Sequence, residues 1–582
     1  MKETCYKNIR KIDNLKDLLN QTIKLNGDKA IFKFKKRMYK KDEKVEFNYM
    51  TYKEFANEVA AFGTALNYLG LQKKRVAVIS KNRYEWIAVY YAVTTGDKVI
   101  VPLDKALPDN EIISLAERSE AEAIVFEDNY KEVMKKIKDE KLSNIKYFIN
   151  MDSLEDTEDF LSYKKLVEKG NTLIKDGDRS QLDVKINAEE MSIILFTSGT
   201  TSLSKAVMLS QKNICENVMG VANVLKFESN DCTLALLPFH HALPALVMHV
   251  LIYVGATYTF CDGLKYITQN LAEYECTVLV AVPAIVEVVY KRIIKQIEKQ
   301  GKTKLVNRMT KVTNLLDKVH INVKKKVFKD VHNALGGHLR LLISAAAPID
   351  SEILKGLKNL GIRAIQGYGL TETAPVLTIE NDFEGKTGSV GKALPNVELK
   401  IDNKDESGIG EIVAKGPNIM LGYYNNENAT KEVLEKDGWF HTGDLGYLDK
   451  NGFLFVTGRK KNVIVQKNGK NIFPEELEVL VNHIPFVKES LIYGKPTKDG
   501  DLDVCVKIVY NKEEIKAVHG YKSEEEILKD MKEYISKIND NMPPYKYIRD
   551  IIITDEELIK TTTAKVKRHE EIAKILADEV KK

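Results

Sequence analysis

The feature that most constrains the fold is an alternation of short, β-branched apolar runs with helical patterns. The runs occupy residues 75–80 (RVAVIS), 99–104 (VIVPLD), 121–128 (AEAIVFED), 145–150 (IKYFIN), 277–283 (TVLVAVP) and 339–346 (LRLLISAA). Continuously apolar strands that alternate with helices are typical of βαβ units, whose helices cover both faces of a parallel sheet. The sequence therefore predicts an α/β fold with a buried, largely parallel sheet.

The pattern changes after about residue 375, where glycines punctuate short strands. Segments such as GEIVAKG (410–416) and GYLDKNGFLFVTGR (446–459) predict a small antiparallel barrel or sheet. Beyond Arg459, the runs SLIYGKP, DLDVCVKIVY and DIIIT and a helical tail predict a compact α+β unit. We therefore expect a large N-terminal region at 1–458, with a small β-barrel subdomain at 376–458, and a small mobile α+β domain at 459–582.

Composition excludes several classes of protein. The 582 residues are 44% hydrophobic and 29% charged, which is ordinary for a globular chain with several cores. A net charge of +5 is too small to indicate a nucleic-acid partner. The cysteines are scattered without a CxxC pair, which favours reduced thiols in a cytoplasmic protein and argues against zinc. They are Cys5, Cys215, Cys232, Cys261, Cys276 and Cys505.

One segment, residues 242–260 (ALPALVMHVLIYVGATYTF), is apolar enough to raise the question of a membrane span. Pro244, His249 and Gly255 interrupt it, so we expect a helix, a glycine turn and a strand. The first residues, MKETCYKNIRKIDN, contain no apolar stretch, and we expect no signal peptide. These patterns predict a cytoplasmic protein.

Residues 196–210 (FTSGTTSLSKAVMLS) form a loop rich in small hydroxyl residues that ends in a lysine. Backbone N–H groups and hydroxyls in such a loop can approach phosphate oxygens closely, and the lysine adds a positive charge. The candidate phosphate-binding residues are Thr197, Ser198, Gly199, Thr200, Thr201 and Lys205. A solvated Ser/Thr-rich turn is the alternative. A P-loop NTPase would need Gly before the lysine and Ser or Thr after it, where this chain has Ser204 and Ala206.

Four motifs in this order resemble the adenylate-forming (AMP-binding) superfamily of acyl-CoA synthetases, peptide-synthetase adenylation domains and luciferases. They are TSGTTSLSKAVMLS, QGYGLTET (366–373), GWFHTGDLG (438–446) and GRKKNVIVQKNGKNIFPEELE (458–478). The resemblance runs from about Leu15 to the C-terminus. Within the superfamily, GKNIFPEELE and VHNALGGHLRLLISAAAPID (331–350) look most like long-chain fatty acyl-CoA synthetases.

The resemblance implies ATP-dependent activation of a carboxylic acid, expected to be a medium- to long-chain fatty acid. The product would be an acyl-AMP, with release of pyrophosphate, followed by thioester formation with coenzyme A. ATP, Mg²⁺ and coenzyme A as co-substrate are the implied small molecules. Three alternatives stay open: an acyl carrier protein as acceptor, an aryl acid as substrate, and a catalytically impaired sensor of acyl groups or nucleotides.

The implied catalytic residues are Lys565, Glu372 and Thr371, with Glu372 and Thr197 as the magnesium ligands. A carboxylate must attack the α-phosphate of ATP, and two unit charges 4 Å apart repel by about 4 kcal/mol at an effective dielectric constant near 20. Cations at the point of attack remove this cost. Without the motifs, Glu372 would be interpreted as a helix-start carboxylate and Lys565 as a solvated tail lysine.

By the same resemblance Tyr368 would stack on adenine, Asp444 would accept hydrogen bonds from the ribose hydroxyls, and Arg459 would reinforce the ribose or phosphate. The remaining implied nucleotide-binding residues are Ala345, Ala346, Ala347, Gln366, Gly367, Gly369 and Thr371. The acyl and coenzyme A tunnel is assigned to His241, Lys467 and Gly469, and the hinge to Lys461. A core histidine is an equal alternative for His241, and a turn aspartate is the alternative for Asp444.

Four residues depart from the usual loops of the superfamily, where glycine or proline is common. They are Ser202, Ser204, Ala206 and Ala564. If glycine is needed there for positive φ, Ala or Ser costs on the order of 1 kcal/mol. We therefore expect slower ATP binding or domain closure, but no loss of a charged group.

A basic helical insertion is expected at residues 291–335. Its first 40 residues, 291–330, carry thirteen lysines and arginines against Glu298, Asp317 and Asp330, a net charge of 13 − 3 = +10. Ile293, Ile294 and Ile297 mark one apolar helix face. The insertion is either a solvated face or a surface for peripheral contact with an anionic membrane.

Overall fold

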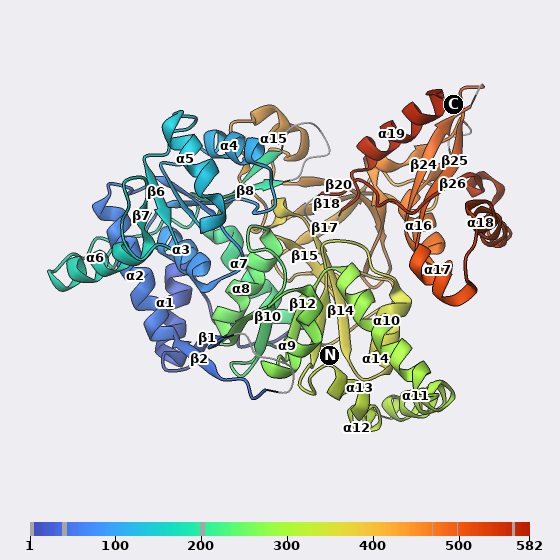
Figure 1. Ribbon diagram of the computed structural model, residues 1–582, viewed down its shortest axis with the longest axis horizontal. Coiled ribbons are helices and arrows are strands. Elements are labelled where there is room, and N and C mark those ends of the chain that lie inside the picture. Colours follow the sequence, from blue (N-terminus) through green and yellow to red (C-terminus); the bar gives the residue numbers. More distant parts are fainter. Residues whose placement is uncertain are drawn as a thin grey trace. The chain divides into compact units, whose positions relative to one another are not determined.

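The computed structural model describes residues 5–37, 43–197, 204–319, 321–467, 470–497, 499–561 and 565–581 (Figure 1). The chain forms two compact units. The first comprises residues 1–197, 205–398 and 414–440, and the second takes in 399–413 and 441–582. The second unit therefore includes part of the small β region as well as the C-terminal segment, and the expected domain boundary at 458/459 stays a prediction.

The first unit contains a sheet in which, over the described residues, eight strands pair in the order β19-β9-β8-β4-β3-β5-β6-β7. Their bounds are β19 Gly422–Tyr423, β9 Lys205–Ser210, β8 Met191–Thr197, β4 Val99–Pro102, β3 Arg75–Ile79, β5 Ala123–Phe126, β6 Tyr147–Asn150 and β7 Leu161–Ser162. The central pairs are parallel, whereas β9 is antiparallel to both of its neighbours. The predicted parallel sheet is confirmed.

A second sheet of the first unit has the order β16-β15-β14-β13-β12-β10-β11-β1-β2 within the described residues. Its strands are β16 Lys392–Ala393, β15 Val376–Ile379, β14 Arg363–Gly369, β13 Leu341–Ser344, β12 Val278–Ala281, β10 Cys232–Ala235, β11 Thr257–Phe260, β1 Ala30–Lys35 and β2 Phe47–Thr51. The central strands are parallel, and antiparallel pairs form both edges. The runs at 277–283 and 339–346 therefore lie in one sheet, as βαβ units predict.

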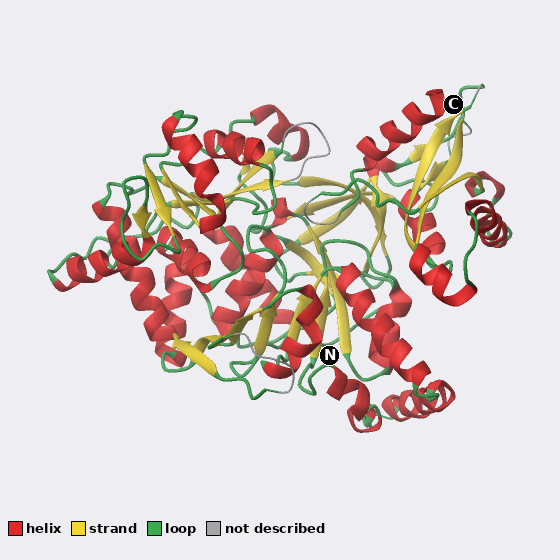
Figure 2. Cartoon of the chain, in the orientation of Figure 1, coloured by secondary structure: helices red, strands yellow, loops and turns green. Residues whose placement is uncertain are grey.

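Helices flank both large sheets of the first unit, as Figure 2 shows in red against yellow strands. They are α1 Leu15–Asn26, α2 Tyr52–Tyr68, α3 Tyr84–Thr94, α4 Asp109–Arg118, α5 Lys131–Asp139, α6 Tyr163–Lys175, α7 Gln211–Val224, α8 Ala242–Val254, α9 Ile267–Glu273, α10 Pro283–Lys299, α11 Thr303–Lys318, α12 Lys324–Val327, α13 Lys329–Ala334, α14 Ser351–Asn359 and α15 Glu427–Val433. Local sequence begins several of them: a capping box between Thr51 and Glu54 starts α2, and Ser210 with Asn213 starts α7.

The apolar segment 242–260 folds as expected, into helix α8, a left-handed Gly255 at φ +77° and strand β11. The residues of β11 pair with β10 and β1 inside the second large sheet. In the part of the chain that the structure describes, we find no helix whose length and hydropathy suit a membrane span.

The basic insertion is helical, as predicted, and consists of the end of α10 followed by α11, α12 and α13. Ile293 and Ile297 on α10 are 5% and 8% exposed, which confirms the predicted apolar face. They join a core that includes Val286, Phe328 and Leu357. The insertion is therefore anchored to the first unit by apolar contacts.

The second unit is rich in strands near its start and combines helices with strands toward its end. Strands β17 (Glu398–Asp402), β18 (Gly410–Lys415), β20 (Phe440–Leu448) and β21 (Leu454–Arg459) form a sheet in that order. Strands β24 (Val487–Pro496), β25 (Leu502–Tyr510) and β26 (Ile548–Thr554) form another, in which β25 is antiparallel to β24 and parallel to β26. The rest comprises β22 Ile464–Val465, β23 Asn471–Ile472, α16 Pro474–Asn482, α17 Lys512–His519, α18 Glu524–Asn539 and α19 Arg568–Lys581. The predicted α+β pattern is confirmed.

Candidate functional site

The two ends of the predicted phosphate loop lie opposite each other on adjacent strands. Thr197 ends β8 and Lys205 begins β9, and the two residues are antiparallel partners. The Thr197 hydroxyl donates a hydrogen bond to the carbonyl oxygen of Lys205 at 3.3 Å. The loop residues Ser198, Gly199, Thr200, Thr201 and Ser202 lie outside the described residues.

The expected backbone strain at Ala206 is corrected by the structure. Ala206 lies in β9, pairs with Phe196 on β8 and is only 6% exposed. Positive φ is what would make Ala costly there, and Ala206 does not have it. Ala206 therefore fits its strand without the predicted cost, whereas Ala564 lies outside the described residues.

Glu372 lies in a 3₁₀ turn, η3 (Thr371–Thr373), directly after β14. Its backbone carbonyl accepts a hydrogen bond from Met420 N at 2.8 Å. Its carboxylate oxygen Oε1 accepts one from the hydroxyl of Tyr423 at 2.9 Å. Burial, and after it the negative charge of Glu372, raise the pKa of Tyr423 well above its usual value, so this hydroxyl remains a donor.

Tyr423 also contacts the lysine of the phosphate loop. Lys205 Nζ lies 4.6 Å from the centroid of the Tyr423 ring, a cation–π distance. The contact arises because β19, which contains Tyr423, pairs with β9, which begins at Lys205. The structure thus brings Thr197 and Lys205 of the phosphate loop together with Glu372, which the sequence analysis identified in a different motif.

Tyr423 is a residue that the sequence analysis missed. It lies in the segment GPNIMLGYYN, which carries no charge and none of the four motifs. Only the pairing of Tyr423 with Val207, 216 positions earlier in the chain, places its hydroxyl on Glu372. The adjacent Tyr424 bonds instead to Glu120 and Arg75.

The motif QGYGLTET forms the end of β14 and the turn that carries Glu372. Gln366 is buried, and its side-chain amide donates to the carbonyl of Ser389 at 3.0 Å. A Cβ atom at Gly369 would lie 1.8 Å from the carbonyl oxygen of Pro375, so only glycine fits there. Gly367 and Tyr368 pair with β15, and Tyr368 is half-buried near the end of β14. Part of this motif therefore shapes the turn.

The predicted base-edge residues Ala345, Ala346 and Ala347 follow β13 directly. Ala346 adopts φ +76°, a left-handed conformation that costs a residue with a Cβ atom about 1 kcal/mol. Ala346 and Ala347 are exposed, whereas Ala345 is buried. The three residues lie at the carboxyl end of β13, the end of the strands at which open α/β sheets bind ligands.

The residues at Glu372 fit a hard divalent cation. Mg²⁺ prefers oxygen ligands and takes one or two from the protein, leaving the others to water and phosphate. The Glu372 carboxylate and the Thr197 hydroxyl offer such oxygens, and Tyr423 fixes the carboxylate orientation. The site chemistry is therefore consistent with the magnesium that the sequence predicted.

In the second unit, the predicted nucleotide-binding residues Asp444 and Arg459 form a cross-strand pair. They are antiparallel partners on β20 and β21, with Arg459 Nε 2.8 Å from Asp444 Oδ1. Asp444 is 4% exposed, and its backbone N–H donates to the hydroxyl of Thr442 at 3.1 Å. The structure thus holds this carboxylate in one orientation by a charge-assisted contact.

Glu411, which the sequence analysis missed, lies next to this pair of strands. Its carboxylate is 2.9 Å from Lys460 Nζ and 3.4 Å from His441 Nδ1, and it accepts a hydrogen bond from Gly443 N at 3.1 Å. Burial by itself would raise the pKa of Glu411, but Lys460, His441 and the backbone donor hold the pKa below its usual value. His441 and Lys460 belong to predicted motifs, so a search for their carboxylate partner could have found Glu411.

Lys565 is exposed on a tight loop of the second unit. Thr561 N donates to the carbonyl of Lys565 at 2.8 Å, and Lys565 N donates to the Thr561 hydroxyl at 3.2 Å. An isolated bridge between Lys560 and Val566 closes the loop. The local backbone therefore fixes Lys565 opposite Thr561, beside the bridge that closes the loop.

The predicted hinge residue Lys461 and the tunnel candidate Lys467 lie in the same unit. Lys461 is exposed in a 3₁₀ turn, η4 (Lys460–Asn462), that directly follows β21. Lys467 is exposed, with its backbone N–H donating to Asp501 Oδ1 at 2.9 Å and its ammonium contacting the carbonyl of Asp499. Gly469 lies outside the described residues. Lys461 is thus at the end of an element, where a change of backbone angles is easiest.

The tunnel candidate His241 forms a cluster with His240 and Asp104 in the first unit. His240 Nε2 is 3.3 Å from Asp104 Oδ1, and the two imidazole rings are 4.0 Å apart between centroids. Ligand atoms of all three residues lie within 4.8 Å of one another, so the group could hold a metal ion or a shared proton.

His249, in contrast, is a core residue. It is fully buried between Tyr91 and Tyr90, and its Nδ1 lies 2.8 Å from the Tyr91 hydroxyl. Burial lowers the pKa of His249 to about 3.

Two long segments of the chain match known protein families. Residues 23–424 match the AMP-binding enzyme family, and residues 461–582 match the AMP-binding enzyme C-terminal domain. Long-chain-fatty-acid–CoA ligase FadD15 of Mycobacterium bovis is 28% identical over 464 residues, which cover 76% of this chain and 75% of that protein. Peroxisomal long chain acyl-CoA synthetase 6 of Arabidopsis thaliana is 29% identical over 474 residues, covering 77% and 67%.

Solved structures share the fold. The anthranilate CoA ligase AuaEII in complex with anthranoyl-AMP superposes with a TM-score of 0.77 at 18% identity, covering 98% of this chain and 99% of that one. ATP-bound MatB from Rhodopseudomonas palustris superposes with a TM-score of 0.73 at 22% identity, covering 98% and 100%. The family match from 23 to 424 spans well over half of the chain, and this protein therefore belongs to the AMP-binding enzyme family.

Proposed function

We propose that this protein activates a carboxylic acid with ATP and transfers the acyl group to the thiol of coenzyme A. In the first half-reaction a carboxylate oxygen attacks the α-phosphorus, the bond to the bridging oxygen breaks, and pyrophosphate leaves. In the second the thiol sulfur attacks the acyl carbon, AMP leaves, and the thiol proton passes to solvent.

The observation that carries the proposal is the cluster of Glu372, Tyr423 and Lys205 at the mouth of the phosphate loop. Attack of an anion on an anion requires positive charge at the point of reaction, and Lys205 supplies one such charge. Tyr423 holds the Glu372 carboxylate at 2.9 Å, so its orientation is set before a ligand arrives. Mg²⁺ held by Glu372 and Thr197 would neutralise phosphate charge.

Lys565 is the remaining catalytic residue of the proposed mechanism. We assign it the contact with the reacting carboxylate and the α-phosphate, because it occupies the catalytic position of the C-terminal loop in the resemblance. Asp444 and Arg459 are assigned to the ribose, and Tyr368 to the adenine. Ala345, Ala346 and Ala347 are assigned to the base edge. Lys461 is the proposed hinge between the two half-reactions.

The proposed substrate is a medium- to long-chain fatty acid. The similar proteins of Mycobacterium bovis and Arabidopsis thaliana carry long-chain names, which supports this assignment without identifying the chain length. All six cysteines are free thiols, which supports a reducing compartment such as the cytoplasm.

The first half-reaction is tested by ATP–pyrophosphate exchange over a panel of fatty and aryl acids. We expect exchange with fatty acids, lowered about 100-fold or more in Lys565→Ala and Glu372→Gln, because each variant removes charge stabilisation of the transition state. Lys567→Ala is the matched control, since this exposed lysine of the same loop pairs with Glu570. Full-rate exchange in Lys565→Ala, or indifference of the folded protein to ATP, would overturn the proposal.

The acceptor is tested in the same reaction mixture. We expect thioester formation with free coenzyme A and none with an acyl carrier protein. Thioester formed on a carrier protein alone would instead establish a carrier-protein ligase.

A further inference from the structure

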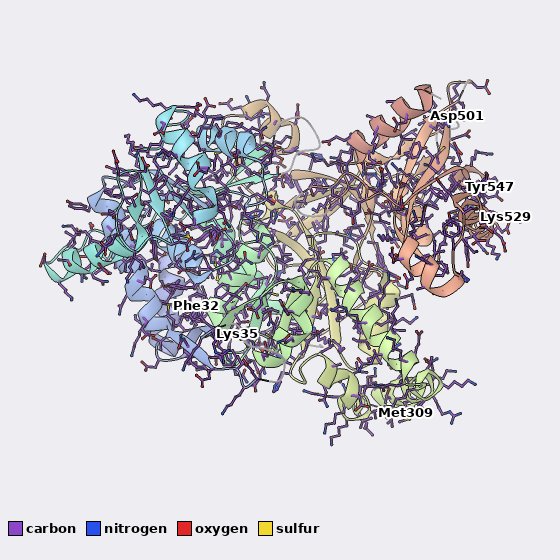
Figure 3. All side chains as sticks on the ribbon, viewed as in Figure 1. Phe32, Lys35, Met309, Asp501, Lys529 and Tyr547 are labelled. Carbon is purple, nitrogen blue, oxygen red and sulfur yellow. The ribbon has the colours of Figure 1, made fainter. Side chains whose placement is uncertain are left out.

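Helix α11 (Thr303–Lys318) carries apolar residues on an exposed face as well as on the face that packs inward, although a surface helix needs only the inward one. The inner face carries Val306 and Met309, which pack against the core of the first unit, and Thr313, which is 1% exposed. The helix packs against α10 and α14, and Figure 3 labels Met309 on it. These contacts account for the inner face.

The outer face exposes a second apolar row. Leu305, Val312 and Leu315 on α11 and Val319 directly after it are 55%, 46%, 65% and 62% exposed. Their spacing of seven, three and four residues places them along one side of a helix. Five of the seventeen large hydrophobic residues exposed in the described part of the chain fall between Leu305 and Ile321. Such a concentration marks an interaction surface rather than scattered exposure.

Basic residues accompany this row. Lys304, Arg308 and Lys311 lie on the same side of α11 and are exposed, and Lys325, Lys326 and Lys329 follow on α12 and α13. Two of the three acidic residues of the insertion are paired: Asp317 with Lys324 at 2.5 Å, and Asp330 with Lys302 at 3.1 Å. The apolar row is therefore bordered by positive charge.

We propose that the outer face of α11, defined as Lys304, Leu305, Arg308, Lys311, Val312 and Leu315, docks onto an anionic lipid bilayer. A solvated helix face would not need a row of exposed leucine and valine. A row of apolar side chains bordered by lysine and arginine matches the acyl boundary and the phosphate headgroups of such a surface, with the helix lying in the plane of the interface. This function goes beyond the proposed catalysis, which does not require a membrane.

The test is sedimentation of the full chain with vesicles of phosphatidylcholine alone or of phosphatidylcholine mixed with phosphatidylglycerol. We expect binding to the anionic vesicles that is at least about tenfold stronger and that weakens with salt. The charge variant Lys304→Glu, Arg308→Glu, Lys311→Glu should weaken it about a hundredfold. The apolar variant Leu305→Gln, Val312→Gln, Leu315→Gln should weaken it about tenfold and keep helix-forming residues.

The matched control reverses three exposed lysines on another helix of the first unit, with Lys164→Glu, Lys169→Glu and Lys175→Glu on α6. It should bind as the unchanged protein does. Equal binding to both vesicle types, or equal loss in the control, overturns the proposal. Self-association that the apolar variant abolishes, without vesicle binding, overturns it in favour of a second copy of the chain. ATP–pyrophosphate exchange should be unchanged in all three variants, which separates this test from that of the proposed function.

Discussion

At the scale of single residues, the pairing of strands decides which side chains meet at the candidate site. Tyr423 has no charge, yet its hydroxyl holds Glu372 at 2.9 Å and its ring lies 4.6 Å from Lys205 Nζ. A hydrogen bond to a carboxylate contributes about 1.5–3 kcal/mol, more than a neutral one. Tyr423 is therefore a positioning residue for the proposed magnesium ligand.

Tyr423→Phe removes the hydroxyl but keeps the ring beside Lys205. We expect the Mg²⁺ concentration for half-maximal ATP–pyrophosphate exchange to rise about tenfold, because Glu372 loses its fixed orientation. Tyr424→Phe is the control, since its hydroxyl serves Glu120 and Arg75. An unchanged Mg²⁺ requirement in Tyr423→Phe would show that Glu372 does not depend on this contact.

At the scale of elements, close approach of helices fixes the N-terminal part of the first unit. Gly170 on α6 faces α2, and a Cβ atom there would lie 1.8 Å from the carbonyl oxygen of Ala61. The helices are long and well formed, so the glycine is not needed for a turn. It is needed because two backbones meet at that point.

Gly170→Ala should therefore destabilise the first unit by about 1–3 kcal/mol. The usual effect of this change inside a helix is the opposite, a gain of about 0.5–1 kcal/mol. Unfolding in urea followed by tryptophan fluorescence measures it, because Trp86 and Trp439 both belong to the first unit.

Asn171→Ala is the adjacent control on the same helix, at an exposed position, and should leave stability unchanged or raise it slightly. Stabilisation by Gly170→Ala would mean that α2 and α6 can separate at little cost.

At the scale of the whole molecule, the proposed residues are divided between two units. Thr197, Lys205 and Glu372 belong to the first, and Asp444 and Lys565 belong to the second. In the proposed function, the first half-reaction needs Lys565 and the second does not. A change of backbone angles at Lys461 is the proposed way to meet both.

Lys461→Pro fixes φ near −65° and removes a backbone donor. We expect exchange within about threefold of the unchanged protein, but thioester formation more than about tenfold slower, because only the second half-reaction needs the rotation. Lys461→Ala, which removes the side chain and leaves the backbone free, should be close to normal in both assays. Equal losses in both half-reactions would argue against a hinge at this position.

The sequence by itself determined the class of fold, most strands and the family. Runs such as RVAVIS and TVLVAVP are local patterns whose burial follows from their own composition, and the motifs are contiguous stretches of chain. The pairing of Asp444 with Arg459 could also be predicted from the sequence, because only a short turn joins β20 to β21. Local periodicity is sufficient wherever the interacting residues are close in sequence.

Only the tertiary structure decided which distant side chains meet. Tyr423 reaches Glu372 and Lys205 because β19 pairs with β9, more than 200 residues away in the chain. The exposed apolar row of α11 is distinguished from the buried one only by tertiary packing, which places Val306 and Met309 against the core. The absence of strain at Ala206 likewise depended on its pairing with Phe196. Such contacts are set by strand order and helix packing, which no local periodicity specifies.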